Sequence, residues 1–470
     1  MKKYISLLLF LVPLVILAQE LRLMKGTIND NIIVNDSLSE TFAIYLPSSF
    51  ETTKAWPIVF VFDMEGKAKQ SLSMLKDAAN QEGYVLASSN NISDTLNLSQ
   101  NVLISSRMFK AVIDIIPVRI NRSYTAGFSD GARFASILPT FLNGIKGVIS
   151  CGASIGNIEI LNSKNPFYFI GIVGREDYNY RAMLVDQKIL DRLKFPNQLL
   201  VFDGGNDWPN NDKLADAMRI FTVHAMSTGD EPKNDSLIRT SYDEFLTEAN
   251  TLFTLNKPIL ANYRLSTISR VFSPLLDLDS LKLTRNSLRR SNSFKTNNRN
   301  QNNYFLKETF TKEDYNYYLE EDIITYNYNN LGWWNYQMSE LEKIEKSSNP
   351  FEKRMGKRLR SYINALIADN MDLIKSEKVV DVEALNFLYM LKTIIEPKNF
   401  DNYMKIISYS AAIEDYGTAL FYLEELLKNG FKNKPKLYEL ENTALLRITP
   451  EFNELVEKYL KESRYDLIKD

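Results

Sequence analysis

A serine flanked by glycines is the first feature of this sequence that could do chemistry. The stretch GFSDG, residues 127–131, places Ser129 in a G-x-S-x-G pattern. In that pattern the serine lies on a sharp strand-to-helix turn, and small flanking residues relieve crowding of the backbone. A serine hydroxyl needs a base to take its proton before it attacks a carbonyl carbon, and histidine is the usual base. The chain has one histidine, His224.

The elements on both sides of Ser129 are those that such a turn requires. Apolar runs alternate with helical patterns as far as residue 228, which predicts a mainly parallel α/β sheet with helices on both faces. The expected strands are residues 41–47, 57–63, 84–90, 124–129, 147–153, 167–174 and 198–204. The expected helices are residues 71–83, 101–116, 130–142, 180–194 and 212–226.

The same pattern predicts where an oxyanion would be stabilised. Asp130 begins the helix that follows the serine, so its backbone N–H would face the developing negative charge. A second donor is expected in the loop after the strand at 57–63, at Met64 or Glu65. A Glu65 carboxylate directed inward would oppose that charge, and one directed outward would not.

The chain after residue 228 has a different character. Its 470 residues are enough for two or three domains, and we divide them into an α/β domain at 19–228, a connector at 229–303 and an all-helical domain at 304–470. Within the connector, the polar tract at 289–303 is expected to be a solvated loop rather than a site for an anionic partner.

Two stretches of the helical domain suggest packing. Trp333, Trp334 and Tyr336 are expected to form core rather than an aromatic binding platform. Residues 415–431 resemble the second helix of a tetratricopeptide repeat, because Ala419, Leu423 and Leu426 occupy its packing positions. We therefore expect helical, repeat-like packing that docks against the α/β domain.

The N-terminus has the order of a secretory signal peptide. Two lysines precede an apolar run from Ile5 to Leu17, and Ala18 precedes the expected cleavage point, so residues 1–18 are predicted to be removed. The run is shorter than the roughly 20 residues that span a bilayer, and Pro13 interrupts it. The sequence predicts a secreted or periplasmic protein without a membrane span.

Composition restricts the partners. The 56 basic and 58 acidic residues nearly cancel, which argues against a nucleic-acid-binding surface. Cys151 is the only cysteine, so no intramolecular disulfide can form, and its apolar setting predicts a buried strand end. No set of residues has the spacing of a metal site, and no cofactor is expected.

Residues 38–228 resemble the secreted α/β-hydrolases of the esterase group that includes polyhydroxybutyrate-depolymerase-like and dienelactone-hydrolase-like proteins. The matching segments are FAIYLPSSF, PIVFVFDMEG, GYVLASSNN, GFSDGARFA, GIVGREDYNY and VFDGGNDWPN. The resemblance implies that Ser129 is the nucleophile and that the acid is Asp177, with Glu176 as the alternative. It also implies a histidine in the stretch GGNDWP, where this chain has Asn206.

An asparagine amide cannot accept the serine proton near neutral pH. His224 is expected on a helix more than 15 Å from the Asn206 loop, as a packing or surface residue. Asp203 and Asp207 are closer, but a carboxylate is a poor base unless burial raises its pKa. We therefore expect weak or lost ester hydrolysis, with binding of a small ligand such as an ester, or of a protein partner through the helical half. The alternative is an active secreted serine hydrolase that uses a base other than histidine.

Overall fold

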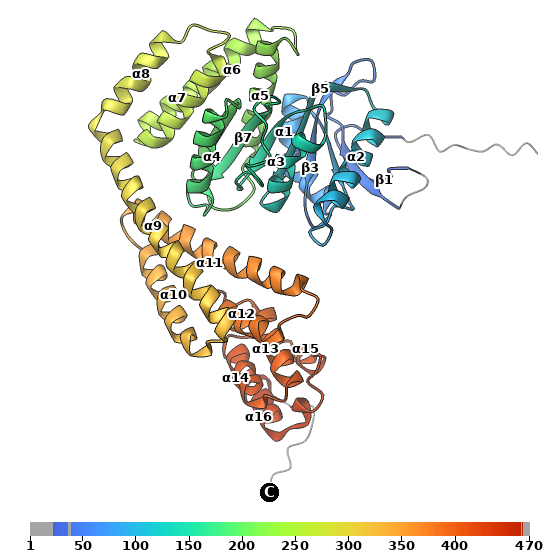
Figure 1. Ribbon diagram of the computed structural model, residues 1–470, viewed down its shortest axis with the longest axis vertical. Helices are drawn as coiled ribbons and strands as arrows, with labels where there is room; N and C mark the ends of the chain where they lie inside the picture. Colours follow the sequence, from blue (N-terminus) through green and yellow to red (C-terminus); the bar gives the residue numbers. More distant parts are fainter. Residues whose placement is uncertain (1–21, 36–38, 462, 464–470) are drawn as a thin grey trace, which may run out of the picture.

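The computed structural model describes residues 22–35, 39–461 and 463. An α/β layer forms one end of the molecule, and helices continue from it to the C-terminus at the other end (Figure 1). The predicted signal peptide at 1–18 lies outside the described residues. Within the described part of the chain, no helix combines the length and apolar character needed to cross a bilayer.

Eight strands form one mixed sheet in the order β1-β2-β4-β3-β5-β6-β7-β8. The strands are β1 (Ile28–Ile33), β2 (Thr41–Tyr45), β3 (Trp56–Phe62), β4 (Val85–Ser89), β5 (Val118–Phe128), β6 (Ile145–Cys151), β7 (Tyr168–Gly174) and β8 (Asn197–Phe202). Strand β2 pairs antiparallel with β1 and β4, and all later pairs are parallel. The fold class and the seven expected strands are confirmed, whereas β1 was not anticipated from the sequence.

Side chains of the central strands alternate between two cores, because successive residues of a strand point to opposite faces. In β3, Val59 and Val61 belong to the core under α1 and α5, whereas Phe60 and Phe62 belong to the core under α2 and α3. The helices of this layer are α1 (Ala68–Glu82), α2 (Leu98–Ile115), α3 (Asp130–Phe141), α4 (Tyr180–Arg192) and α5 (Asn211–Thr228). Cys151 is buried and unpaired at the end of β6, as predicted.

The first of these cores continues beyond residue 228. Phe245, Ile268 and Leu281 pack in the same hydrophobic cluster as α5. These residues belong to α6 (Asp235–Thr254), α7 (Pro258–Phe272) and α8 (Asp279–Arg290). The predicted boundary at 228 therefore does not separate two hydrophobic cores.

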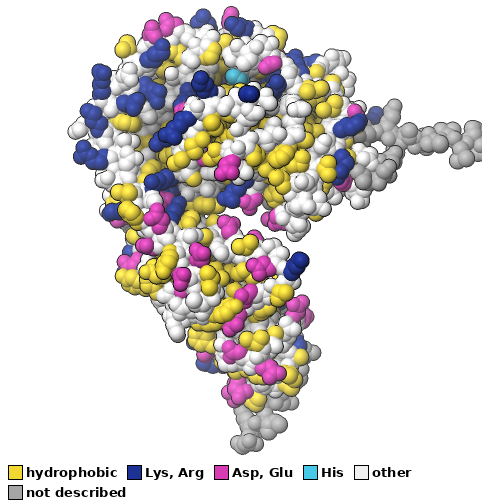
Figure 2. Space-filling model, viewed as in Figure 1, with side chains coloured by type: hydrophobic (Ala, Val, Ile, Leu, Met, Phe, Trp, Pro, Cys, Tyr) yellow, Lys and Arg dark blue, Asp and Glu magenta, His cyan; other side chains and the backbone are white. Residues whose placement is uncertain are grey.

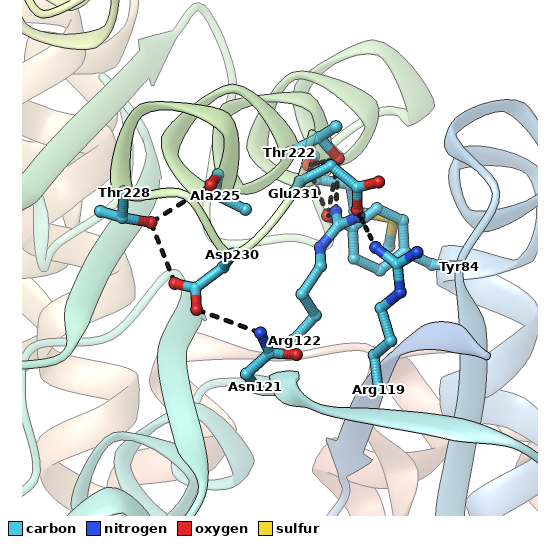
Figure 3. A network of polar contacts seen from close by, with 10 residues as sticks. Tyr84, Arg119, Asn121, Arg122, Thr222, Ala225, Thr228, Asp230 and Glu231 are labelled. Atoms are coloured by element: carbon cyan, nitrogen blue, oxygen red, sulfur yellow. Dashed lines mark hydrogen bonds and ion pairs between the residues drawn. The ribbon is translucent and has the colours of Figure 1, made fainter. Parts of the chain in front are cut away.

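A polar network ties the start of this helical segment to the sheet (Figure 3). Arg119 and Arg122 of β5 both donate to the carboxylate of Glu231, just after α5. The Arg122 guanidinium, of which 5% is exposed, also donates to the Tyr84 hydroxyl at 2.8 Å. Buried charges need such partners, and this network fixes the chain direction as it leaves the α/β layer.

The polar tract at 289–303 is helical, so its prediction as a loop was wrong. It forms the end of α8 and the start of α9 (Asn292–Thr325), and Ser291 caps α9 by accepting from the Phe294 N–H at 3.2 Å. The asparagines of the tract have low helix propensity, but tertiary packing overrides propensity. Gln301 and Phe305 of α9 are buried against the α/β layer, and Tyr315 and Leu319 of the same helix lie in the next core.

The remaining helices form two further cores. They are α10 (Leu331–Glu345), α11 (Pro350–Ser376), α12 (Val382–Ile395), α13 (Phe400–Ala412), α14 (Tyr416–Lys428), α15 (Lys434–Tyr438) and α16 (Pro450–Leu460), with short 3-10 helices η1 (Tyr328–Asn330) and η2 (Leu446–Ile448). Trp334 is fully buried and its Nε1 donates to Asp322 at 2.7 Å, as expected of a packing residue. Tyr336 of the same stretch is 57% exposed, so its prediction as a core residue was wrong. The three residues expected to pack in α14, namely Ala419, Leu423 and Leu426, are all buried.

Candidate functional site

Ser129 occupies the tight turn between β5 and α3. Its backbone has φ 51° and ψ −122°, a strained conformation for a residue other than glycine. A Cβ atom at Gly131 would lie 2.2 Å from the carbonyl oxygen of Phe62, and one at Gly127 would lie 2.3 Å from the Gly131 carbonyl carbon. Only glycine fits at these two positions, which explains the spacing of the motif.

The backbone of Ser129 is held firmly while its hydroxyl is not. Its N–H donates to the Cys151 carbonyl at 3.1 Å, and its own carbonyl accepts from the N–H groups of Ala132 and Arg133, both at 3.0 Å. The side chain is half-buried and makes no hydrogen bond to any described residue. The turn therefore presents a serine without an attached base.

Asp177 lies in the loop after β7 and is 1% exposed. Its Oδ1 accepts from the Asn179 N–H at 2.7 Å and from the Asn206 Nδ2 at 3.1 Å. Burial raises the pKa of Asp177 to about 6, against the opposing effect of these two hydrogen bonds. The alternative acid, Glu176, is paired instead with Lys357 at 2.6 Å.

Glycine at position 152 lets Asp177 approach the serine turn. A Cβ atom there would lie 2.9 Å from the ring of Phe128 and 3.1 Å from the Asp177 Oδ2. Phe128 immediately precedes Ser129, and its ring stacks on Trp208 with 5.5 Å between centroids. The loops after β5, β6, β7 and β8 therefore meet at the carboxyl edge of the sheet.

Asn206 is half-buried in the loop after β8, where the resemblance implied a histidine. Its amide nitrogen donates to Asp177, as an imidazole Nδ1–H would. The structure thus brings Asp177 and Asn206 together although 29 residues separate them. The amide has no second nitrogen that could accept a proton from serine.

The other bases considered from the sequence, His224, Asp203 and Asp207, are not suited to the task. His224 packs edge-on against Tyr168, at 4.5 Å between ring centroids, at the start of β7. A strand of 7 residues such as β7 is roughly 20 Å long. His224 lies beside its first residue, whereas Asp177 lies in the loop beyond its last residue, so the two are far apart. Burial would raise the pKa of Asp203, but its hydrogen bond from Lys257 and the Arg175 charge lower it overall. Asp207 is exposed to solvent.

Met64 and Glu65, the two residues predicted as the second oxyanion donor, differ in whether their backbone N–H is already hydrogen-bonded. The Glu65 N–H already donates to the Asp63 Oδ1 at 2.8 Å, so Glu65 was wrong as a donor. Its carboxylate pairs with Lys67 and is 64% exposed, which directs it outward. The Met64 N–H has no partner among the described residues, and Asp130 is the first residue of α3. Met64 and Asp130 therefore remain as predicted donors.

Helices α9 and α11 hold the loop that carries Asp177. Arg358 of α11 donates to the Arg175 carbonyl at 2.8 Å, and Lys312 of α9 donates to the Tyr178 carbonyl at 3.0 Å. Arg358 is also paired with the buried carboxylate of Glu308 at 2.7 Å. The sequence contained no local signal for the two contacts to the loop, because their partners lie 183 and 134 residues apart.

The known structures that resemble this chain do so only remotely. No protein-family model matches the sequence, and a search of curated proteins gives no match either. A ferulic acid esterase is 14% identical with a TM-score of 0.33, over 42% of this chain and 97% of that chain. Est1E from Butyrivibrio proteoclasticus is 12% identical with a TM-score of 0.32, over 41% and 97%. Esterase B from Lactobacillus Rhamnosis is 12% identical with a TM-score of 0.36, over 43% and 89%. The assignment of an α/β-hydrolase type of fold rests on the mixed sheet and on the turn at Ser129.

Proposed function

We propose that this chain is a binding protein with the architecture of a serine esterase, and that its ester hydrolysis is weak or lost. The observation that carries the proposal is the hydrogen bond from Asn206 to Asp177, which takes the place of the acid–histidine contact. The ligand proposed for the serine edge is a small ester or a similar carbonyl compound. Secretion through the segment at 1–18 is part of the same proposal.

The chemical reason lies in the two functions of a triad histidine. One ring nitrogen donates to the acid, and the other takes the serine proton and returns it to the leaving group. An asparagine amide supplies the first function and not the second. Loss of the histidine in a well-studied serine protease costs on the order of 10⁶ in turnover and leaves roughly 10³–10⁴ over the uncatalysed rate.

A fluorophosphonate probe tests this proposal, because it labels only an activated serine. We expect weak labelling of the unaltered protein, no higher than that of Ser129→Ala. Asn206→His should raise the rate of Ser129 labelling by about 10²–10⁴-fold, the usual contribution of a general base. Asn165→His, at an exposed loop position, is the matched control and should have no effect.

The outcomes separate clearly. Strong labelling of the unaltered protein that disappears in Ser129→Ala would contradict the loss of hydrolysis. A gain in Asn206→His that persists when Ser129 is also replaced by alanine would contradict the proposed geometry.

A second candidate function is hydrolysis with a carboxylate base, and one observation favours it. The pKa of Asp177 is raised to about 6, which brings this carboxylate closer to the basicity that proton transfer near neutral pH requires. In that case the labelling of the unaltered protein would increase as the pH rises through about 6, and Asp177→Asn would abolish it.

A further inference from the structure

An open groove of about 860 Å³ lies between η1, α12, α13 and α14. Its lining is mainly aromatic and aliphatic and includes Tyr328, Met390, Tyr409, Ile413, Phe421 and Tyr422. Phe421 is 57% exposed and Ile413 is 63% exposed, so large apolar side chains face solvent here. The volume is within the range of about 300–1,000 Å³ that is usual for binding sites.

A buried amide in the groove has an unused acceptor. Asn386 of α12 lines the groove and is only 6% exposed. Its Nδ2 donates to the Ser410 Oγ at 3.3 Å, and its Oδ1 has no partner among the described residues. A buried polar atom without a hydrogen bond costs about 1–3 kcal/mol, so this oxygen favours the arrival of an N–H donor.

The rim of the groove is acidic. Asp381, Glu383 and Asp415 all line it, and none of them pairs with a lysine or arginine of the described chain. Burial, together with the charges of Glu383, Asp381 and Asp415, raises the pKa of Tyr328 to about 12. Acidic and hydrophobic side chains also alternate over the visible face of the C-terminal helices (Figure 2). The rim therefore contains three carboxylates that pair with no lysine or arginine of the described residues.

We propose that this groove binds a short segment of a partner protein in which apolar side chains alternate with lysine or arginine. The apolar side chains cover Phe421 and Ile413, the cations pair with the rim carboxylates, and a backbone N–H of the segment donates to Asn386. Nucleic acid and anionic lipid are disfavoured because the rim would repel them. This inference is independent of the chemistry at Ser129.

The test uses residues 19–470, that is, the chain without its predicted signal peptide. The ligand is a fluorescein-labelled peptide of nine residues in which lysine and leucine alternate. We expect a saturable rise in fluorescence anisotropy at protein concentrations up to about 100 µM. Two matched peptides, one with glutamate for lysine and one with serine for leucine, should bind at least about tenfold more weakly, since both charge and apolar contact contribute.

Matched variants then locate the site. Glu383→Lys and Phe421→Ser should each weaken binding of the lysine–leucine peptide at least about tenfold, because charge pairs and aromatic anchors dominate such interfaces. Glu454→Lys and Phe310→Ser are the controls, and Phe310 is 58% exposed on α9. All four positions are at the surface, so folding is not at risk.

Three results would overturn the proposal. They are no binding of the lysine–leucine peptide, equal binding of the glutamate–leucine peptide, and equal loss in the control variants. Light scattering that shows self-association abolished by Phe421→Ser would also overturn it, because the occupant would then be a second copy of this chain.

Discussion

The carboxyl edge of the sheet and the groove of the C-terminal helices each contain a buried polar side chain, and the two differ in what remains free. Asp177 has its Oδ1 occupied by two donors, and its loop is held by α9 and α11. Among the described residues, the Asn386 side chain makes one hydrogen bond, to Ser410, and its oxygen has no partner. Asp177 thus helps to hold its own loops together, whereas Asn386 leaves an acceptor available among the described residues.

The hydrogen bond between Asp177 and Asn206 preserves the architecture of a catalytic triad without its proton transfer. A triad acid is useful when the residue it orients can move a proton, and Asn206 cannot. The same hydrogen bond that would position a histidine here only stabilises the loops. In the helical region, Asp381 and Asp415 cap α12 and α14, whereas the Asn386 Oδ1 has no partner among the described residues. Binding is therefore expected where the chain leaves polar groups unsatisfied.

The largest expected change in the free energy of unfolding comes from replacing a glycine by alanine, which we compare between the serine turn and the helical region. Gly131→Ala places a Cβ 2.2 Å from the Phe62 carbonyl oxygen, so the turn must rearrange. We expect a loss of at least about 4 kcal/mol in the free energy of unfolding, measured by chemical denaturation, as for severe backbone and packing conflicts. Gly332→Ala on α10 has nothing within 4 Å and should stabilise by up to about 1 kcal/mol. Equal effects would mean that the serine turn is not strained.

The buried ion pair between α9 and α11, beside the Asp177 loop, gives the next largest effect. Arg358→Met leaves Glu308, which is 1% exposed, with only Lys312 as a cationic partner. Breaking a buried pair should lower the free energy of unfolding by about 3–5 kcal/mol. Arg360→Met, two residues along the same helix, breaks a more exposed pair and should cost no more than about 1 kcal/mol. Replacing Glu308 by leucine in the Arg358→Met background should recover most of the loss, and a failure to recover would argue against a charge effect.

A smaller effect is the pH dependence that Asp177 gives to the α/β region. The folded pKa of about 6 exceeds the unfolded value of 3.8, so the folded chain binds the proton more tightly. Stability from this group is therefore greatest below about pH 4 and falls as the pH rises to about 6, by at most roughly 3 kcal/mol. Asp177→Asn should remove this slope in unfolding experiments at a series of pH values. Exposed Asp207→Asn should retain it, and an unchanged slope in Asp177→Asn would assign the effect to another group.

The smallest effect compares one substitution in both regions. Asn386→Leu removes an unpaired oxygen together with one hydrogen bond, so the free energy of unfolding should change by no more than about 1 kcal/mol. Asn101→Leu removes an amide that accepts from the Ser93 N–H at 3.1 Å and donates to its carbonyl at 2.7 Å. It should cost about 2 kcal/mol or more, because the half-buried N–H and carbonyl of Ser93 lose their partner together. A similar loss at both positions would mean that Asn386 has a partner in solution.

Much of the α/β region could be predicted because its signals are local. The apolar run that became β3 and the glycines around Ser129 are read within about ten residues. The helix over 289–303 could not be predicted, because its asparagines disfavour helix and its stability comes from Phe305 packing on β7 and α4. Glu65 failed as a donor for a similar reason, since only the folded loop shows that Asp63 already accepts its N–H.

The sequence by itself determined the strand-to-helix turn and the absence of histidine at position 206, because residue types and short periodic patterns suffice for both. Only the tertiary structure decided that Asn206 meets Asp177 and that α11 holds the acid loop. It also decided that Asn386 lines a groove in which its oxygen has no partner among the residues that the structure describes. These outcomes depend on contacts between segments far apart in the chain, whose geometry is set by the packing of whole elements rather than by any local preference.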